Sequence, residues 1–174
     1  INKAKSTISS KAVTAIYNNN KYLVITLKDA YGKAIKNAKV TVTLASAKTY
    51  TTDKNGQIKI NVGKLVPKTY TAKIKFAGNT NLLASSTTAK VTVKKATPKM
   101  TAKAKTFKVK VKTKKYTITL KTNKNKVMKK VKVTLKVNKK TFKAKTNSKG
   151  VATFKITNLK KKGKCTATIK FAGS

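Results

Sequence analysis

Apolar residues alternate with lysine and threonine along much of the chain. Residues 131–137 read V-K-V-T-L-K-V, and residues 107–111 read F-K-V-K-V. Shorter stretches at residues 58–60 (I-K-I) and 74–76 (I-K-F) repeat the pattern. Because successive side chains of a strand point to opposite faces, this period predicts half-buried strands with one face on a core and one in water. No stretch of ten residues shows a helical period.

Turn-forming residues separate these runs. Asp53–Gly56 reads D-K-N-G and Asn147–Gly150 reads N-S-K-G, and each has a glycine able to adopt a positive φ. Ala30–Lys33 and Asn123–Lys126 stand between earlier runs in the same way. About seven short strands in each half, with turns every ~8–12 residues, predict an all-β, two-sheet sandwich.

The two halves of the chain are copies of one module. K-V-T-V at Lys39–Val42 returns as K-V-T-L at Lys132–Leu135, and T-A-K-I-K-F-A-G at Thr71–Gly78 returns as T-A-T-I-K-F-A-G at Thr166–Gly173. Further matching blocks keep the same order. We therefore expect two tandem domains, repeat 1 at residues 1–95 and repeat 2 at residues 96–174.

The second copy is expected to lack its last strand. The first copy continues after F-A-G through Asn79–Lys95, which ends in A-K-V-T-V-K-K, whereas the second has only Ser174 after this motif. Two interpretations stay open. The chain stops inside a repeat of a longer protein, or a neighbouring repeat or chain supplies the strand by pairing with the open sheet edge.

The high positive charge of the chain bears most strongly on whether it folds. The chain has 44 basic residues, all lysine, against two acids, and its formal net charge is +42. Repeat 1 holds 18 of the lysines and both acids, and repeat 2 holds 26 lysines. Such charge opposes compaction, and with modest hydrophobicity it favours disorder as a competing interpretation. The regular alternation argues for folding, with the lysines outside.

Few residues of the sequence are candidates for catalysis or metal binding. Asp29 and Asp53 stand at turns, where an aspartate bonds its own backbone, and repeat 2 has Thr122 and Asn147 in their places. Calcium needs several carboxylates together, which this chain cannot supply. It also has no histidine. We therefore expect no catalytic, cofactor-binding or metal-ligating residue, no cofactor, and no enzymatic activity.

Two further features of the sequence concern covalent chemistry. A lysine–asparagine crosslink needs a catalytic acid beside the pair, so we expect none in repeat 2 and one in repeat 1 only through Asp29. Cys165, the single cysteine, stands at the position of Tyr70 in repeat 1. We expect a small buried hydrophobe there, with a reactive thiol beside Lys164 as the alternative.

The repeated motifs resemble a known family. Y-x-I-T-L-K, then G-K-x-I-K-N-A-K-V-T-V, T-Y-T-T-D-K-N-G and Y-T-A-K-I-K-F-A-G-N-T are similar to the bacterial-type immunoglobulin-like (Ig-like) repeats of adhesin-like surface proteins from methanogenic archaea. The resemblance covers most of both copies. It implies two tandem Ig-like β-sandwich domains in an extracellular, cell-surface or cell-wall stalk or adhesion module, with no catalytic residues to carry over.

The expected partners follow from the lysines. A lysine surface gives salt-sensitive binding to polyanions, so we expect anionic surface polymers or glycans. The absence of arginine and of an aromatic stripe argues against specific nucleic-acid recognition. The alternatives are an electrostatic anchor to an anionic cell-wall polymer and a non-specific nucleic-acid binder. No apolar run approaches the ~20 residues of a membrane helix.

Overall fold

The computed structural model describes residues 2–108, 110–157, 159 and 162–172. They form two compact units, unit 1 at Ile1–Ala96 and unit 2 at Thr97–Ser174. The described residues are almost entirely strands and loops, with one 3₁₀ turn, η1 (Val62–Lys64). The predicted all-β class and Ig-like sandwich architecture are confirmed. Among the residues described, no helix is long and apolar enough to cross a membrane.

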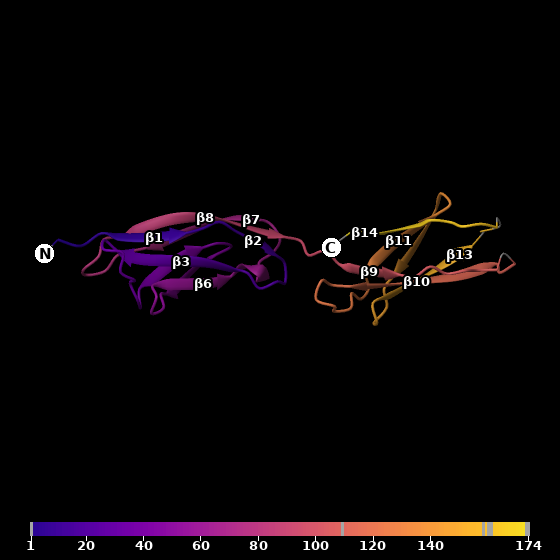
Figure 1. Cartoon of the computed structure of the whole chain (residues 1–174), viewed down its shortest axis with the longest axis horizontal. Coiled ribbons are helices and arrows are strands. Elements are labelled where there is room, and N and C mark those ends of the chain that lie inside the picture. The colour runs from indigo at the N-terminus through magenta and orange to yellow at the C-terminus, as the bar shows by residue number, and fades with distance from the viewer. Residues whose placement is uncertain (1, 109, 158, 160–161, 173–174) are drawn as a thin grey trace. The chain divides into compact units, whose positions relative to one another are not determined.

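Unit 1 is a sandwich of two sheets (Figure 1). One sheet has the order β1-β3-β6 and the other has the order β2-β8-β7-β4-β5. Neighbouring strands run antiparallel, except that β2 and β8 are parallel. The strands are β1 (Ser6–Ser10), β2 (Val13–Ile16), β3 (Tyr22–Asp29), β4 (Lys39–Thr43), β5 (Ala47–Thr51), β6 (Gln57–Asn61), β7 (Thr69–Phe76) and β8 (Ser85–Lys94).

The inward positions of both sheets build the core of unit 1. β7 shows the alternation most clearly, because Tyr70, Ala72, Ile74 and Phe76 are buried while every intervening residue is exposed. The larger buried aliphatic side chains of the other strands are those of Ile8, Leu23, Ile25, Leu27, Val40, Val42, Ile58, Val91 and Val93. Each such side chain contributes ~1.5–3 kcal/mol when it is fully buried.

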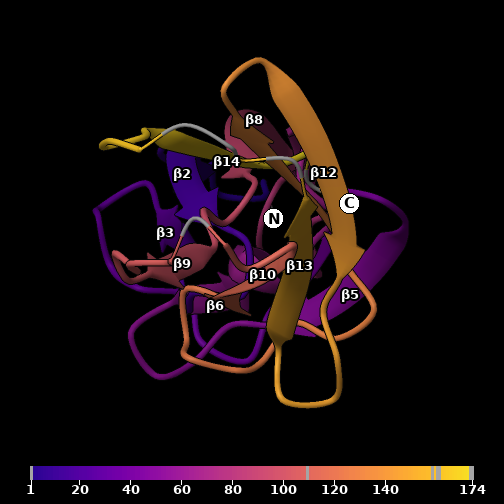
Figure 2. The same cartoon turned by 90° about the vertical axis from the view of Figure 1, so that its right-hand side faces the viewer.

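Unit 2 repeats part of this frame. Its sheets have the orders β9-β10-β13 and β12-β11-β14, which match β1-β3-β6 and β5-β4-β7 of unit 1. Figure 2 shows the loop that leads from β12, at the edge of one sheet, to β13, at the edge of the other. The strands are β9 (Lys99–Ala102), β10 (Thr113–Lys121), β11 (Lys132–Val137), β12 (Lys140–Lys145), β13 (Val151–Thr157) and β14 (Ala167–Phe171).

No strand among the described residues of unit 2 corresponds to β8. In unit 1, β8 pairs with β7 on one side and with β2 on the other. Within the described part of unit 2, β14 pairs with β11 alone. Burial changes accordingly: Ile74 is 1% exposed, whereas its counterpart Ile169 is only half-buried, and the counterpart of buried Ala72, Ala167, is exposed.

The predicted strand at residues 107–111 is wrong. Residues 103–108 are in no strand, Phe107 is half-buried and Val111 is 45% exposed. Val109 lies outside the described residues. The segment stands between β9 and β10, as β2 stands between β1 and β3, and β2 pairs only with β8. Because unit 2 presents no such partner strand among its described residues, the alternation has nothing to pair with.

The lysines of the strands occupy the outward positions, with one exception. Lys59, Lys75, Lys132 and Lys136 are exposed, as the alternation predicts. Lys114 is at an inward position of β10 and is only 4% exposed. Its Nζ donates a hydrogen bond to the carbonyl oxygen of Val111 at 2.6 Å. The prediction that every lysine lies in solvent is wrong for this residue, whose ammonium group uses a backbone acceptor.

Candidate functional site

Both acids hold turns. The Asp29 carboxylate accepts hydrogen bonds from the backbone N–H groups of Tyr31 and Lys33, each at 2.9 Å. The Asp53 carboxylate accepts from Asn55 at 2.8 Å and from Gln57 at 2.9 Å. The oxygen of each side chain therefore replaces backbone acceptors in a tight turn. The structural role predicted for Asp29 and Asp53 is confirmed.

Unit 2 makes the same turns without a charge. The Asn147 amide oxygen accepts from Lys149 at 2.9 Å and from Val151 at 3.1 Å. The Thr122 hydroxyl accepts from Lys126 at 3.2 Å. Asn125 has a φ of 61° where unit 1 has Gly32 at 80°, a left-handed conformation that asparagine tolerates. The turns need an oxygen acceptor rather than a carboxylate.

A buried threonine directly after β5, and its counterpart directly after β12, bonds to the segment that leads into the neighbouring strand. Thr52 Oγ1 accepts a hydrogen bond from Ala38 N–H at 2.9 Å and donates one to the Ile35 carbonyl at 2.7 Å. Thr146 Oγ1 accepts from Val131 N–H at 3.0 Å. Because Thr52 and Thr146 accept the same backbone hydrogen bond, we treat them as equivalent positions when residues of the two units are compared.

Cys165 is not the buried hydrophobe that its position predicts. Tyr70 is 6% exposed in β7, opposite Val91 of β8. Cys165 is exposed and precedes β14, and its Sγ accepts a hydrogen bond from Asn138 Nδ2 at 3.3 Å. Because the described part of unit 2 has no counterpart of β8, nothing covers this position. The prediction is wrong for that reason.

Lysines face each other across strands in unit 2. Lys115 is paired with Lys155, Lys99 with Lys121, and Lys132 with Lys145. Directly opposed residues have Cβ atoms ~4.5–5.5 Å apart, and like charges there are destabilising. In the strand registers of unit 1, the lysines of β7 instead face threonine or serine. Unit 2 therefore carries paired positive charges that an anion would neutralise.

Among the described residues, three lysines lie over aromatic rings. The distances from Nζ to the ring centroid are 4.8 Å for Lys68 and Tyr70, 5.3 Å for Lys105 and Phe107, and 5.5 Å for Lys48 and Tyr50. Each distance is within the ~6 Å at which a cation is attracted to a ring face. These contacts cover aromatic surface rather than leave it open to a ligand.

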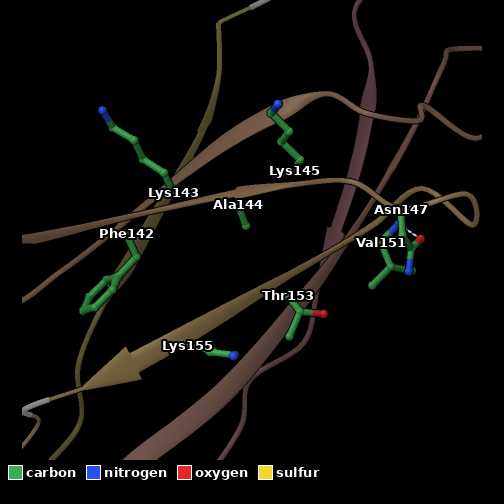
Figure 3. Close-up of a pocket in the computed structure, with 8 residues that line it drawn as sticks. All are labelled: Phe142, Lys143, Ala144, Lys145, Asn147, Val151, Thr153 and Lys155. Carbon is green, nitrogen blue, oxygen red and sulfur yellow. Dashed lines mark hydrogen bonds between the residues drawn. The ribbon is translucent and has the colours of Figure 1, made fainter.

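An open groove lies between β12 and β13 of unit 2, where two sheet edges meet (Figure 3). Its volume is about 380 Å³. Phe142 and Ala144 point from β12 toward β13, whereas Lys143 and Lys145 extend from the opposite face of β12 (Figure 3). The lining residues are Phe142, Lys143, Ala144, Lys145, Asn147, Val151, Thr153 and Lys155. Local sequence patterns do not reveal this groove, because it arises between strands that are not paired.

The described ranges contain no group of three or more Cys, Asp or Glu side chains that could hold a metal ion. The groove between β12 and β13 is instead lined by cationic, apolar and hydroxyl-bearing side chains. Such a lining can bind an anion that also has an apolar face.

The turn acceptors provide a stability test. Replacing Asp53→Ala removes the acceptor for two backbone N–H groups, and we expect the free energy of unfolding to fall by ~1–2 kcal/mol. Replacing Asp53→Asn copies the Asn147 turn and should cost less than ~0.5 kcal/mol. Urea unfolding of the full chain measures both. Equal losses for the two variants would show that the negative charge, rather than the acceptor, holds the turn.

Comparison with known proteins supports the fold. No family model and no curated protein matches the chain. Bacterial invasin, described as an integrin-binding protein, matches with a TM-score of 0.53 and 17% identity over 97% of this chain and 36% of its own. Adhesin InvE of Yersinia pseudotuberculosis matches with a TM-score of 0.43 and 18% identity over 94% of this chain and 54% of its own.

The D0–D1 domains of intimin match with a TM-score of 0.38 and 16% identity, over 97% of this chain and 91% of that structure. The chain thus spans 36% of the invasin structure and 54% of the InvE structure. At 17% identity the likeness to invasin concerns the fold alone, and it agrees with the tandem Ig-like β-sandwich architecture of this chain.

Proposed function

We propose that the chain is a non-enzymatic, extracellular module of an adhesin-like cell-surface protein, with weak and salt-sensitive binding to polyanions. The observation that carries the proposal is the combination of tandem Ig-like sandwiches with outward lysine faces. The sandwich holds the lysines on a rigid scaffold. The sheets leave them in solvent, where they can meet a partner.

The fold comparison supports the surface role. The invasin structure, with a TM-score above 0.5, is of a protein described as integrin-binding. Fold likeness at 17% identity does not transfer a ligand, so integrin binding is not proposed for this chain. What we propose is the coarser role of a stalk or adhesion segment at a cell surface or wall. The archaeal origin that the sequence resemblance implies stays a prediction.

The charge pattern supports binding to polyanions. The pairs Lys115–Lys155, Lys99–Lys121 and Lys132–Lys145 place like charges opposite each other. A polymer with repeated negative groups relieves that repulsion when it lies across the strands, and it releases its own counterions as it binds. Lysine acts as a point charge without the planar fork of arginine, so this binding is broad rather than selective.

The concentration of paired lysines in unit 2 favours a second candidate role. In this role the module is an electrostatic anchor that holds its protein within an anionic cell-wall polymer. The two roles differ in the partner rather than in the physics. A nucleic-acid role is less favoured, because the chain has no arginine for bidentate base recognition.

Salt dependence tests the polyanion proposal. Binding of the full chain to a wall polymer, a heparin-like polysaccharide and DNA is measured as salt rises. If six to ten lysines engage the polymer, affinity should fall by ~10³–10⁵ between ~50 and ~200 mM salt. Equal, steep slopes for all three polymers are expected. Absence of binding to any of them at low salt would contradict the proposal, and selective binding that survives high salt would replace it with a specific adhesin site.

We also propose that a neighbouring repeat or chain pairs with the open edge of β14. The support is the half-burial of Ile169 and the exposure of Ala167, where β7 has buried side chains covered by β8. An added strand gives main-chain hydrogen bonds along the edge and covers these apolar side chains. A segment with the chemistry of β8, S-S-T-T-A-K-V-T-V-K, fits that edge.

A peptide with the sequence of residues 85–94 tests this pairing. Added to the full chain, it should slow hydrogen exchange of the β14 amides at Ala167–Phe171, because these groups gain strand partners. The control peptide carries proline at the positions of Ala89 and Val91, which removes two ladder donors. Protection by the first peptide alone is expected. No protection, or equal protection by both peptides, would contradict strand pairing.

A further inference from the structure

The groove between β12 and β13 is lined at several positions by residues that differ from those at the equivalent positions of unit 1. Thr52 and Thr146 are equivalent anchors, and the registers place Tyr50 opposite Val40 and Ala144 opposite Val133. Ala144 therefore stands where unit 1 has Tyr50. A methyl group in place of a phenol ring leaves space between the two edge strands, and the groove of about 380 Å³ occupies that space.

A second position of this edge strand, that of Lys48 in unit 1, also has a different kind of side chain in unit 2. Lys48 of unit 1 has its Nζ 5.5 Å from the centroid of the Tyr50 ring and so covers that ring. The register places Lys48 opposite Val42 and Phe142 opposite Leu135, so Phe142 takes the place of Lys48. Unit 2 has thus lost both the ring that fills the space and the lysine that covers it. It has gained a half-buried phenyl group that points toward β13 (Figure 3).

Lysines stand along both rims of this groove. Lys143 and Lys145 of β12 replace Thr49 and Thr51, and Lys155 of β13 replaces Asn61. Lys145 lies opposite Lys132. Lys155 lies opposite Lys115. The flexible four-carbon stem of lysine lets an ammonium group on the outer face of an edge strand turn toward a ligand at its rim.

We propose that this groove binds an anionic saccharide, with the apolar face of one sugar ring against Phe142 and Ala144. The lysines at the rims receive the carboxylate or sulfate groups of that sugar and its neighbours. The Thr153 hydroxyl lies on the β13 side of the groove, where it can bond a ring hydroxyl. The inference rests on the proposed polyanion binding and assigns it a preferred site and ligand class.

The mixed lining distinguishes this ligand from other polyanions. A polyphosphate chain offers charge but no apolar ring face, so it gains nothing from Phe142, Ala144 or Val151. A neutral glycan offers the ring but leaves the lysines without counter-charges. Small-molecule sites of ~300–1,000 Å³ commonly combine an apolar lining with a few polar groups. This groove lies at the small end of that range and is open to solvent, which suits one or two units of a longer chain.

Filling the groove without changing charge tests the inference. The variant Ala144→Tyr restores the residue of unit 1 and keeps the net charge, and its reciprocal control is Tyr50→Ala in unit 1. An oligogalacturonate and a polyphosphate of equal charge are the probes, titrated against the full chain at constant low salt. We expect Ala144→Tyr to weaken oligogalacturonate binding by about tenfold, with polyphosphate binding unchanged. Tyr50→Ala should bind both probes like the parent chain.

A second pair of variants keeps the test valid if Ala144→Tyr does not fold, as judged by circular dichroism. Lys143→Thr, Lys145→Thr and Lys155→Asn are combined in one chain. The matched control combines Lys→Thr changes at exposed Lys124, Lys126 and Lys129, which are outside the groove lining. Both chains lose three charges. We expect the ratio of oligogalacturonate affinity to polyphosphate affinity to fall in the groove variant and to keep the parent value in the control.

The outcomes separate the two proposals. If the parent chain binds both probes and neither groove variant changes their ratio, the saccharide site is contradicted while diffuse polyanion binding stands. If the parent chain binds neither probe at low salt, both proposals fail. Preferential loss of the oligogalacturonate in the groove variants supports a built site.

Discussion

Burial of aliphatic side chains must offset the mutual repulsion of the lysines, and the remaining features of this structure depend on that balance. The chain has a net charge of +42 and only two carboxylates, and both carboxylates serve turns. Stabilisation by ion pairs is therefore a minor contribution. Strict alternation lets each strand place valine, isoleucine, leucine or phenylalanine inside and lysine or threonine outside. The lysine surface is tolerated because a packed core lies directly beneath it.

Comparison of the two units shows how much one strand, β8, contributes to the burial of apolar side chains. β8 brings Ala89, Val91 and Val93 into the core of unit 1 and covers β7. Where unit 2 shows no counterpart among its described residues, Ile169 is half-buried, Cys165 is exposed and residues 103–108 form no strand. These three differences have one cause, the open edge of β14. Unit 2 combines this more open core with the larger share of lysines, which makes it the unit with more to gain from a partner.

Much of the fold could be predicted from the sequence, because period-two alternation and turn residues are local signals. The strands at residues 131–137 and 74–76, and the turns at Asp53 and Asn147, depend on neighbours in sequence and were predicted correctly. The strand at residues 107–111 and the burial of Cys165 depended on a distant partner strand, so local alternation gave the wrong answer. The groove at Ala144 could be found only when the strand registers showed which residue of unit 1 it replaces.

The most direct test of this account is the reactivity of individual lysines. The full chain is acetylated with a limiting amount of reagent, folded and in urea, and each site is quantified by peptide mass spectrometry. Outward lysines such as Lys59, Lys75, Lys132 and Lys136 should react alike in both states, whereas Lys114, only 4% exposed, should react only after unfolding. Protection of the outward lysines, or rapid labelling of Lys114 in the folded chain, would contradict an aliphatic core beneath a lysine surface.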